Sequence, residues 1–431
     1  MSISRREFVT KVAEMAVGAS LCEALQQQTS AALNASFWSL QNPQYVFLNR
    51  TPGYNWDQSR PETITESVFL EPINAVGTSH SSTRRLGLSF ILSYNNAKIA
   101  NLEQTLDAIL AGSLKNDVPV LIVLDGENWW NGTPELWNWW DRSKPGYDPQ
   151  NAENVEWTDW GPENAIKISW RNWGNQIRVL PQPNLGSPRF RQVSKSKLMR
   201  LAKKLKQWND SLPADRRYLF PGVKIGWEAC VGINAYYYPD GNSYLEKYPN
   251  DPSHDPQQGM NMAKDFAGGL APLGYAALTS LGLRHGGPVT LEDQERVTRN
   301  YLEFLASCCH QTGLPRNRVF THAGGQYPPW NLHYSHDVAI NENSYPGWSL
   351  YFRSPRDAGD LGESLRKAKM VDWCAAEWLP AANTAEEWLN AIDDTLGFLR
   401  CHFISVYNWE GIWQKPGAVR GIGMAIAENA N

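Results

Sequence analysis

The sequence predicts an α/β fold: a (β/α)8 TIM barrel with long loop insertions over the carboxyl-terminal face of its strands. Short apolar runs alternate with amphipathic helical stretches through most of the 431 residues, which is the pattern of a parallel sheet covered by helices. Several of these runs are apolar at nearly every position, as expected of strands that are covered on both faces. Eight such runs are present, and eight parallel strands close a barrel.

The predicted strands end in polar or aromatic residues, at the face where barrel enzymes carry their sites. In chain order they are Tyr45–Asn49, Leu88–Tyr94, Val118–Asp125, Val223–Glu228, Val319–His322, Gly347–Phe352, Met370–Glu377 and Phe403–Trp409. The stretch Thr51–Arg85 contains no good helix, so the first βα unit is expected to be irregular or absent. An alternative numbering therefore starts the barrel at Leu88 and counts Val338–Glu342 as a strand.

Four long amphipathic helices are predicted from apolar residues that recur at helical spacing. Their apolar faces contain Leu102 to Leu110, Leu198 to Trp208, Val297 to Cys309 and Trp388 to Leu399. Lysines on the second helix indicate a solvated face. The net charge of −4 and the pI near 6.1 give no bulk electrostatic case for nucleic acid. No apolar run approaches the ~20 residues needed to cross a bilayer, so stable membrane insertion is not expected.

Two long insertions follow predicted strands and should therefore overhang the carboxyl-terminal face. The first, residues 127–190, contains nine tryptophans, and the second, residues 234–258, is rich in Tyr, Pro, Asp and Asn. Long loops in a compact domain tend to be functional, so we expect them to wall a cleft. The alternative for the first insertion is a satellite subdomain with its own core. Residues 36–431 are expected to form a single catalytic domain.

The amino-terminal residues 1–35 are expected to be a separate segment. Ser4-Arg5-Arg6-Glu7-Phe8 resembles the twin-arginine export signal, and a moderately apolar stretch follows it,. This resemblance implies a periplasmic or secreted protein; the alternative is an ordinary amino-terminal helix on a cytoplasmic protein. The six cysteines show no CxxC or metal-ligand spacing,. We interpret them as buried free thiols.

Two glutamates stand out because each ends a predicted strand beside tryptophan. Glu228 follows Trp227, and Glu377 precedes Trp378, about 150 residues later. In a barrel, both would converge on one face. Two carboxyl groups in different environments are what glycosidic cleavage requires: one holds a proton for the leaving oxygen, and the other stays ionised to stabilise an oxocarbenium-like centre.

These residues resemble clan A of the retaining glycoside hydrolases. The clan consists of (β/α)8 enzymes with an acid/base glutamate after strand four and a nucleophile glutamate after strand seven. The resemblance implies that Glu228 is the acid/base and Glu377 the nucleophile. It also implies that Trp409, in Tyr407-Asn408-Trp409-Glu410, is the strand-eight tryptophan that floors the sugar site. The clan usually has Asn before the acid/base, where it contacts the substrate 2-hydroxyl; here Trp227 occupies that position.

Further substrate-binding residues are predicted at the same face. They comprise the residues beside the two glutamates, the ends of other strands and two insertion aromatics: Trp227, Trp378, Asp125, Glu127, His322, Asn408, Trp409, Glu410, Trp129, Trp130 and Tyr236. Asp125, Glu127, Glu410 and Glu342 are alternative catalytic carboxylates. His333 and His336 have His-x-x-His spacing, but no third ligand at strong spacing supports a metal site. No cofactor is predicted.

The sequence thus predicts a glycoside hydrolase that cleaves an oligo- or polysaccharide by a retaining mechanism. One alternative is a carbohydrate-binding barrel without catalysis, in which the aromatic cleft persists and the two carboxylates are not opposed. Another is an inverting glycosidase that uses a different carboxylate pair. Carboxyl groups about 5–5.5 Å apart favour retention, and about 6.5–9.5 Å favours inversion. No feature of the sequence indicates an oligomeric state.

Overall fold

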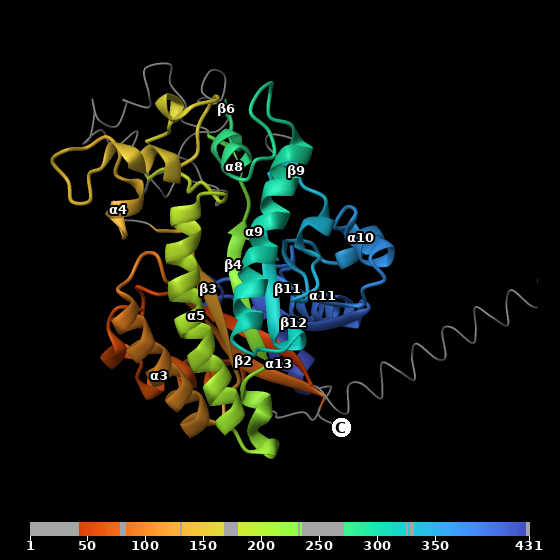
Figure 1. Cartoon of the computed structure of the whole chain (residues 1–431). Coiled ribbons are helices and arrows are strands. Elements are labelled where there is room, and N and C mark those ends of the chain that lie inside the picture. The colour runs from red at the N-terminus through yellow and green to blue at the C-terminus, as the bar shows by residue number, and fades with distance from the viewer. Residues whose placement is uncertain are drawn as a thin grey trace, which may run out of the picture.

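The computed structural model describes residues 43–77, 83–129, 132–167, 180–231, 233–234, 271–324, 326–327 and 332–427. In this described part of the chain, eight parallel strands form a closed barrel that is surrounded by helices (Figure 1). Around the barrel the strands follow the order β1-β2-β3-β4-β7-β10-β11-β12, and β12 pairs with β1 in parallel register. The predicted (β/α)8 fold is confirmed.

All eight predicted strands are present, with ends that differ by a few residues. They are β1 (Gln44–Arg50), β2 (Arg84–Ser93), β3 (Val120–Asp125), β4 (Gly222–Ala229), β7 (Val319–Ala323), β10 (Gly347–Leu350), β11 (Asp372–Trp378) and β12 (Arg400–Val406). The alternative numbering that started at Leu88 is wrong, because Gln44–Arg50 pairs along its length with β2 and Val338 lies in a 3-10 turn, η8 (His336–Ala339). Glu228 therefore belongs to the fourth barrel strand and Glu377 to the seventh.

The four predicted long helices are also confirmed. They are α3 (Ile99–Asn116), α5 (Pro188–Ser211), α9 (Leu291–Gln311) and α11 (Ala385–Gly397). Capping boxes begin α9, at Thr290, and α11, at Thr384, where the threonine and the acidic residue three positions later satisfy each other's backbone N–H groups. The other helices are α2 (Glu66–Val76), α4 (Pro134–Trp137), α8 (Tyr275–Ser280), α10 (Leu361–Lys367), α12 (Trp409–Ile412) and α13 (Pro416–Ala427).

Helix α2 corrects the expectation that Thr51–Arg85 contains no good helix. Pro72 lies inside it, yet Val68, Phe69 and Ile73 are buried. The proline breaks the helical pattern in the sequence, and packing against the barrel overrides that local signal.

Short elements complete the chain between the long ones. Two small antiparallel sheets pair β5 (Ile233–Asn234) with β6 (Ala271–Pro272) and β8 (Gln326–Tyr327) with β9 (Leu332–His333). The 3-10 turns besides η8 are η1 (Pro61–Thr63), η2 (Pro149–Asn154), η3 (Pro162–Asn164), η4 (Ala214–Leu219), η6 (Arg316–Arg318) and η9 (Pro355–Asp357).

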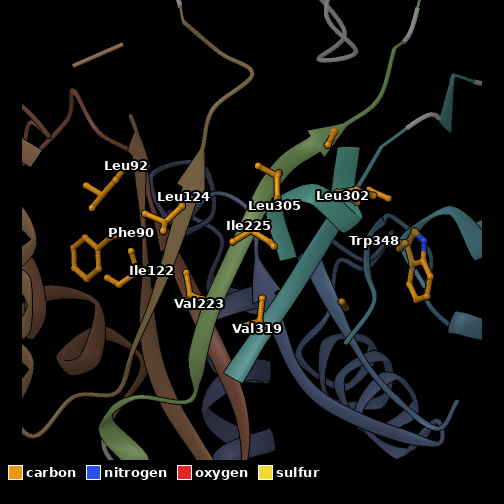
Figure 2. Close-up of a cluster of buried hydrophobic side chains, with 14 of the residues drawn as sticks. Phe90, Leu92, Ile122, Leu124, Val223, Ile225, Leu302, Leu305, Val319 and Trp348 are labelled. Carbon is orange, nitrogen blue, oxygen red and sulfur yellow. The ribbon is translucent and has the colours of Figure 1, made fainter. Parts of the chain in front are cut away.

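The main core lies between the outer face of the barrel and the helices. Figure 2 shows this packing: side chains of β2, β3 and β4 project toward the helix layer, and Leu305 of α9 lies beside Ile225 of β4. Because side chains alternate along a strand, the residues between these outward-facing ones point into the barrel.

The barrel interior is filled by a second, smaller cluster. Tyr45, Phe47, Phe320 and Phe403 are among its residues, and the rings of Phe320 and Phe403 lie edge to face with centroids 4.8 Å apart. These aromatic rings occupy the amino-terminal and middle parts of the strands. The carboxyl-terminal ends of the strands carry buried polar side chains instead, among them Asp125, Glu228 and Glu377. This is the face where the site is expected.

The Trp-rich insertion contributes to the main core wherever it is described. Trp137 and Trp157 are buried in the same cluster as the barrel's outer face. In Figure 1, α4 lies beside the upper end of α5, and α8 lies beside the upper part of α9, toward the carboxyl-terminal end of the barrel. The first insertion thus overhangs that face, and its described part shares its core with the barrel. Residues 235–270, most of the second insertion, lie outside the described residues.

Two further predictions concern the cysteines and the amino terminus. Cys230, Cys308, Cys309, Cys374 and Cys401 are buried free thiols, as predicted. Residues 1–42, with Cys22 and the twin-arginine-like segment, lie outside the described residues. Among the helices that the structure describes, none is long and apolar enough to cross a bilayer.

Candidate active site

Glu228 lies at an irregular point of β4, where the backbone departs from strand geometry. The register between β4 and β7 shifts between Ile225 and Ala229, Gly226 has φ of +77°, and Glu228 itself has φ of +50°. A left-handed conformation at a non-glycine residue costs on the order of 1–3 kcal/mol, and such residues are enriched at functional sites. The irregularity sets the direction of the Glu228 side chain, as bulges next to active sites do.

The end of β7 approaches Glu228 so closely that only glycine fits there. A Cβ atom at Gly324 would lie 2.4 Å from the backbone oxygen of Glu228, and the Gly324 N–H donates to the Ala229 carbonyl at 3.0 Å. Without a side chain in the way, β4 and β7 stay paired through the irregular stretch. The close contact between the two strands therefore helps to stabilise the left-handed backbone conformation at Glu228.

Glu377 lies at a second irregularity, near the end of β11. The register with β12 shifts between Ala375 and Trp378, and the register with β10 shifts just before the pair Ser349 and Glu377. Two donors hold its carboxylate: the indole N–H of Trp227 reaches Oε2 at 3.0 Å, and the hydroxyl of Tyr351 donates to Oε1. Hydrogen bonds to the charged form of a carboxyl group stabilise that form.

The two glutamates face one shared site, because the same residues connect them. Trp227 directly precedes Glu228 and donates to Glu377. Ser349 is the β10 partner of Glu377 in the sheet, and its hydroxyl donates to Glu228 Oε1 at 2.7 Å. Two acidic residues that are 149 positions apart in the sequence thus lie at the same end of the barrel, linked through strands four, six and seven.

His322 completes a line of hydrogen bonds that ends on Glu228. Its Nε2 lies 2.9 Å from Ser349 Oγ. Burial and the Lys224 charge hold the pKa of His322 well below its usual value, so the ring is neutral near pH 7. Because the Ser349 hydroxyl donates to Glu228, we assign the ring proton to Nε2; within the described part of the chain, Nδ1 has no hydrogen-bond partner. His322, which was predicted to bond either a sugar or a catalytic carboxylate, is thus connected to Glu228 through Ser349.

The charges of the two glutamates act on nearby tyrosines. Burial, and then the Glu377 and Glu228 charges, hold the pKa of Tyr351 well above its usual value. The same causes, with Tyr54, raise the pKa of Tyr407 to about 12. The Tyr351 hydroxyl is buried against Glu377, although 45% of the residue as a whole is exposed. Tyr351 therefore connects the buried Glu377 carboxylate to the protein surface.

Three tryptophans predicted to contact substrate belong to the core instead. Trp378 packs edge to face on Trp388 of α11 and donates to Thr395 Oγ1 at 3.2 Å. The indole N–H of Trp129 donates to the Pro181 carbonyl, and that of Trp409 donates to Glu71 of α2. All three are at most 1% exposed. The predicted contacts are corrected, because a parallel barrel buries the outer side of its strand ends beneath helices.

Two predicted carboxylates are used in local structure. Asp125 accepts from the Ser93 hydroxyl at 2.8 Å and from the backbone N–H groups of Glu127 and Asn128 at 3.1 Å, so it fixes the turn after β3. Glu127 Oε2 accepts from the Gly126 N–H, and the Glu127 charge helps to raise the pKa of Tyr94. Both carboxylates are fully buried, which corrects their assignment to substrate.

Glu410 is also structural. It forms an ion pair with the fully buried Arg50 of β1 at 3.0 Å and accepts from the Thr51 N–H at 3.2 Å. Burial raises the pKa of its carboxyl, and Arg50 opposes that rise. Asn408 accepts from the Thr51 hydroxyl at 2.8 Å and is half-buried, so β1 and the end of β12 are tied together beside the site.

The remaining predictions concern insertion aromatics and metals. Trp130 and Tyr236 lie outside the described residues. His333 is exposed, and His336 pairs through Nδ1 with Asp360. Among the residues that the structure describes, no three His, Cys, Asp or Glu side chains lie together as a metal site would require.

Sequence reasoning missed three residues of the site. Ser349 and Tyr351 alternate at the end of the sixth strand, and this two-residue spacing could have placed both on the inner face with Glu377. Lys224 is the third: it is the one charged residue in the run Val223–Trp227 and is fully buried. A lysine inside an apolar strand signals a buried partner, since isolated buried charges are costly.

Comparison with known proteins gives only remote similarity. No family model matches the sequence, and no curated protein matches it. One solved structure that is similar is that of an endogalactoceramidase, with a TM-score of 0.39 and 9% sequence identity over 90% of this chain and 74% of that chain. This similarity is too remote to bear on function, which has to be inferred from the site itself.

Proposed function

We propose that this chain is a retaining glycoside hydrolase that acts on an oligo- or polysaccharide, with Glu228 as acid/base and Glu377 as nucleophile. The observation that carries the proposal is the hydrogen bond from Trp227, the neighbour of Glu228, to Glu377 at 3.0 Å. It links the segment that carries Glu228 to Glu377 at the carboxyl-terminal end of the barrel, which supports a shared site. Both glutamates lie at irregular strand positions, as functional residues often do.

The surroundings of each glutamate suit its proposed role. Glu377 accepts from an indole and a phenol, which stabilise its carboxylate and fix its direction for attack on an anomeric carbon. Glu228 accepts from the hydroxyl of Ser349, which can rotate when the carboxyl group gains or loses a proton. A group that must act first as acid and then as base benefits from such an adaptable partner.

The reaction proceeds in two displacements. A Glu377 oxygen attacks the anomeric carbon, the bond from that carbon to the leaving oxygen breaks, and Glu228 gives its proton to that oxygen. Glu228 then takes a proton from water, whose oxygen attacks the same carbon and releases Glu377. The anomeric configuration is retained because it is inverted twice.

The test uses the full chain with a panel of 4-nitrophenyl glycosides and oligosaccharides. On any substrate cleaved, Glu377→Gln should lower kcat/KM by at least about 10³-fold and Glu228→Gln by about 10²–10⁴-fold. Glu342→Gln is the matched control: Glu342 was an alternative carboxylate in the sequence and is exposed, so this variant should keep full activity. Proton NMR of the first product should show retained anomeric configuration.

Azide distinguishes the two roles. With Glu377→Ala, azide should yield a glycosyl azide of inverted configuration, and with Glu228→Ala one of retained configuration. An inverted hydrolysis product from the wild type would instead favour the inverting alternative. Saccharide binding without hydrolysis across the whole panel would favour the non-catalytic barrel.

A further inference from the structure

We propose that Lys224, inside the barrel, is a positioning residue: its ammonium group anchors the backbone directly before Glu377 and places a positive charge near the Glu377 carboxylate. This inference rests on the proposed function, since it assigns a role toward the proposed nucleophile. Lys224 contacts no substrate in this role and acts only through Glu377.

The position of Lys224 is set by the alternation of β4. Its neighbours Val223 and Ile225 face the helix layer (Figure 2), so Lys224 faces the barrel interior. It is fully buried. Its Nζ donates to the carbonyl of Ala376, the residue directly before Glu377, at 2.7 Å. The lysine therefore reaches from strand four to strand seven just beneath the nucleophile.

The groups that face Lys224 come from four strands, and the carboxylates among them favour its charge. Glu377 and Cys374 lie on β11, Glu228 on β4, Asp125 on β3 and His322 on β7. Burial lowers the pKa of Lys224 to about 8, while the carboxylates, Glu377 first, oppose that shift. Burial holds the pKa of the Cys374 thiol well above its usual value, and His322 is neutral. Near pH 6, Lys224 is thus a cation among carboxylates.

Burying the charge of a lysine lowers the stability of the fold, so a functional role would explain why a lysine occupies this position. An apolar residue of similar volume in place of a buried ion is often neutral or stabilising. Leucine or methionine would fill the same volume beside the aromatic cluster of the barrel interior. A positive charge near a carboxylate favours its charged form, and the charged form is the one that the proposed nucleophile Glu377 needs.

The experiment compares the wild type with Lys224→Met and Lys224→Gln. Both variants remove the charge, and glutamine keeps an N–H donor. Carbon-13 NMR of labelled glutamate side chains, with Glu377→Gln to assign the signal, follows the titration of the Glu377 carboxyl. Its midpoint should rise by about 1 unit or more in both variants, and the acid limb of the kcat/KM profile should move by the same amount.

The control is Lys197→Met on α5, outside the barrel. Lys197 is also partly buried with a lowered pKa, and its Nζ donates to Asn95 at 3.3 Å. This variant should leave the Glu377 midpoint unchanged. An unchanged midpoint in both Lys224 variants would overturn the proposal. The titration needs no substrate, so it tests the role of Lys224 independently of hydrolysis. A wild type that hydrolyses nothing would refute the proposed function and leave the role of Lys224 open to this test.

Discussion

Replacing Trp227 with phenylalanine tests the contact on which the proposed active site most depends. The change keeps an aromatic ring beside Glu228 and removes only the N–H that reaches Glu377 Oε2 at 3.0 Å. A hydrogen bond to a charged group contributes about 1.5–3 kcal/mol. Since each 1.36 kcal/mol is a factor of ten in rate, kcat/KM should fall by about 10- to 150-fold.

The matched control is Trp378→Phe. Trp378 follows Glu377 in the chain, but its N–H donates to Thr395 on the helix side of the barrel at 3.2 Å. This variant should lose about 0.5–1.5 kcal/mol of unfolding free energy and keep its activity. The half-buried Trp227 should show the opposite behaviour, losing activity with little change in stability. Chemical denaturation and initial rates measure both quantities.

The result that would refute this reasoning is specific. If Trp227→Phe kept kcat/KM within about twofold of wild type, the indole would not orient the nucleophile, and the link between the two glutamates would lose its functional meaning. Equal losses of activity in Trp227→Phe and Trp378→Phe would point to general disturbance of the barrel end instead.

Three further predictions follow from single contacts. Ser349→Ala removes the donor to Glu228 at 2.7 Å and should lower kcat/KM about tenfold in rate assays, whereas Ser89→Ala, which removes a serine pair elsewhere in the barrel, should not. Burial raises the pKa of Glu156 to about 8 from 4.5; its contribution to stability is therefore full below pH 4.5 and lost as pH rises through 8. Glu156→Gln should remove a pH-dependent loss of about 5 kcal/mol in unfolding free energy across that window, measured by chemical denaturation at each pH. The lowered pKa of Lys224 has the opposite sense: relative to Lys224→Met, wild-type stability should rise by about 3 kcal/mol between pH 8 and 10.5 in the same assay.

The fold was predictable because its signals are repeated. Each βα unit of the barrel supplies one apolar run and most supply one amphipathic helix, so an error in one unit, such as the missed α2, leaves the count of eight intact. The glutamates were predictable for a related reason. Topology alone sends the carboxyl ends of parallel strands to one face, so Glu228 and Glu377 had to lie at the same end of the barrel once their strands were identified.

The predicted tryptophans failed for a physical reason. At the end of a barrel strand, one residue faces the site and the next faces the helices, and a one-residue shift exchanges them. Register shifts occur at both glutamates, and no sequence pattern marks them. Trp378 was therefore assigned to the site although it packs on Trp388, and Tyr351 was overlooked although it donates to Glu377.

Within the barrel strands, irregular backbone occurs at both proposed catalytic residues. Glu228 has a left-handed φ, Gly226 precedes it with another positive φ, and the strands on both sides of Glu377 lose register there. Proteins tolerate such departures mainly at functional sites, where surrounding packing offsets them. Gly324 and the buried Lys224 fit the same pattern. A side chain cannot be placed at position 324, and an apolar residue at position 224 would avoid burying a charge. A barrel whose only task was to fold would have regular strands and an apolar interior at these positions. These features all lie around Glu228 and Glu377, and each is unfavourable for folding, so together they favour the proposed catalytic role of these two residues over a purely structural one.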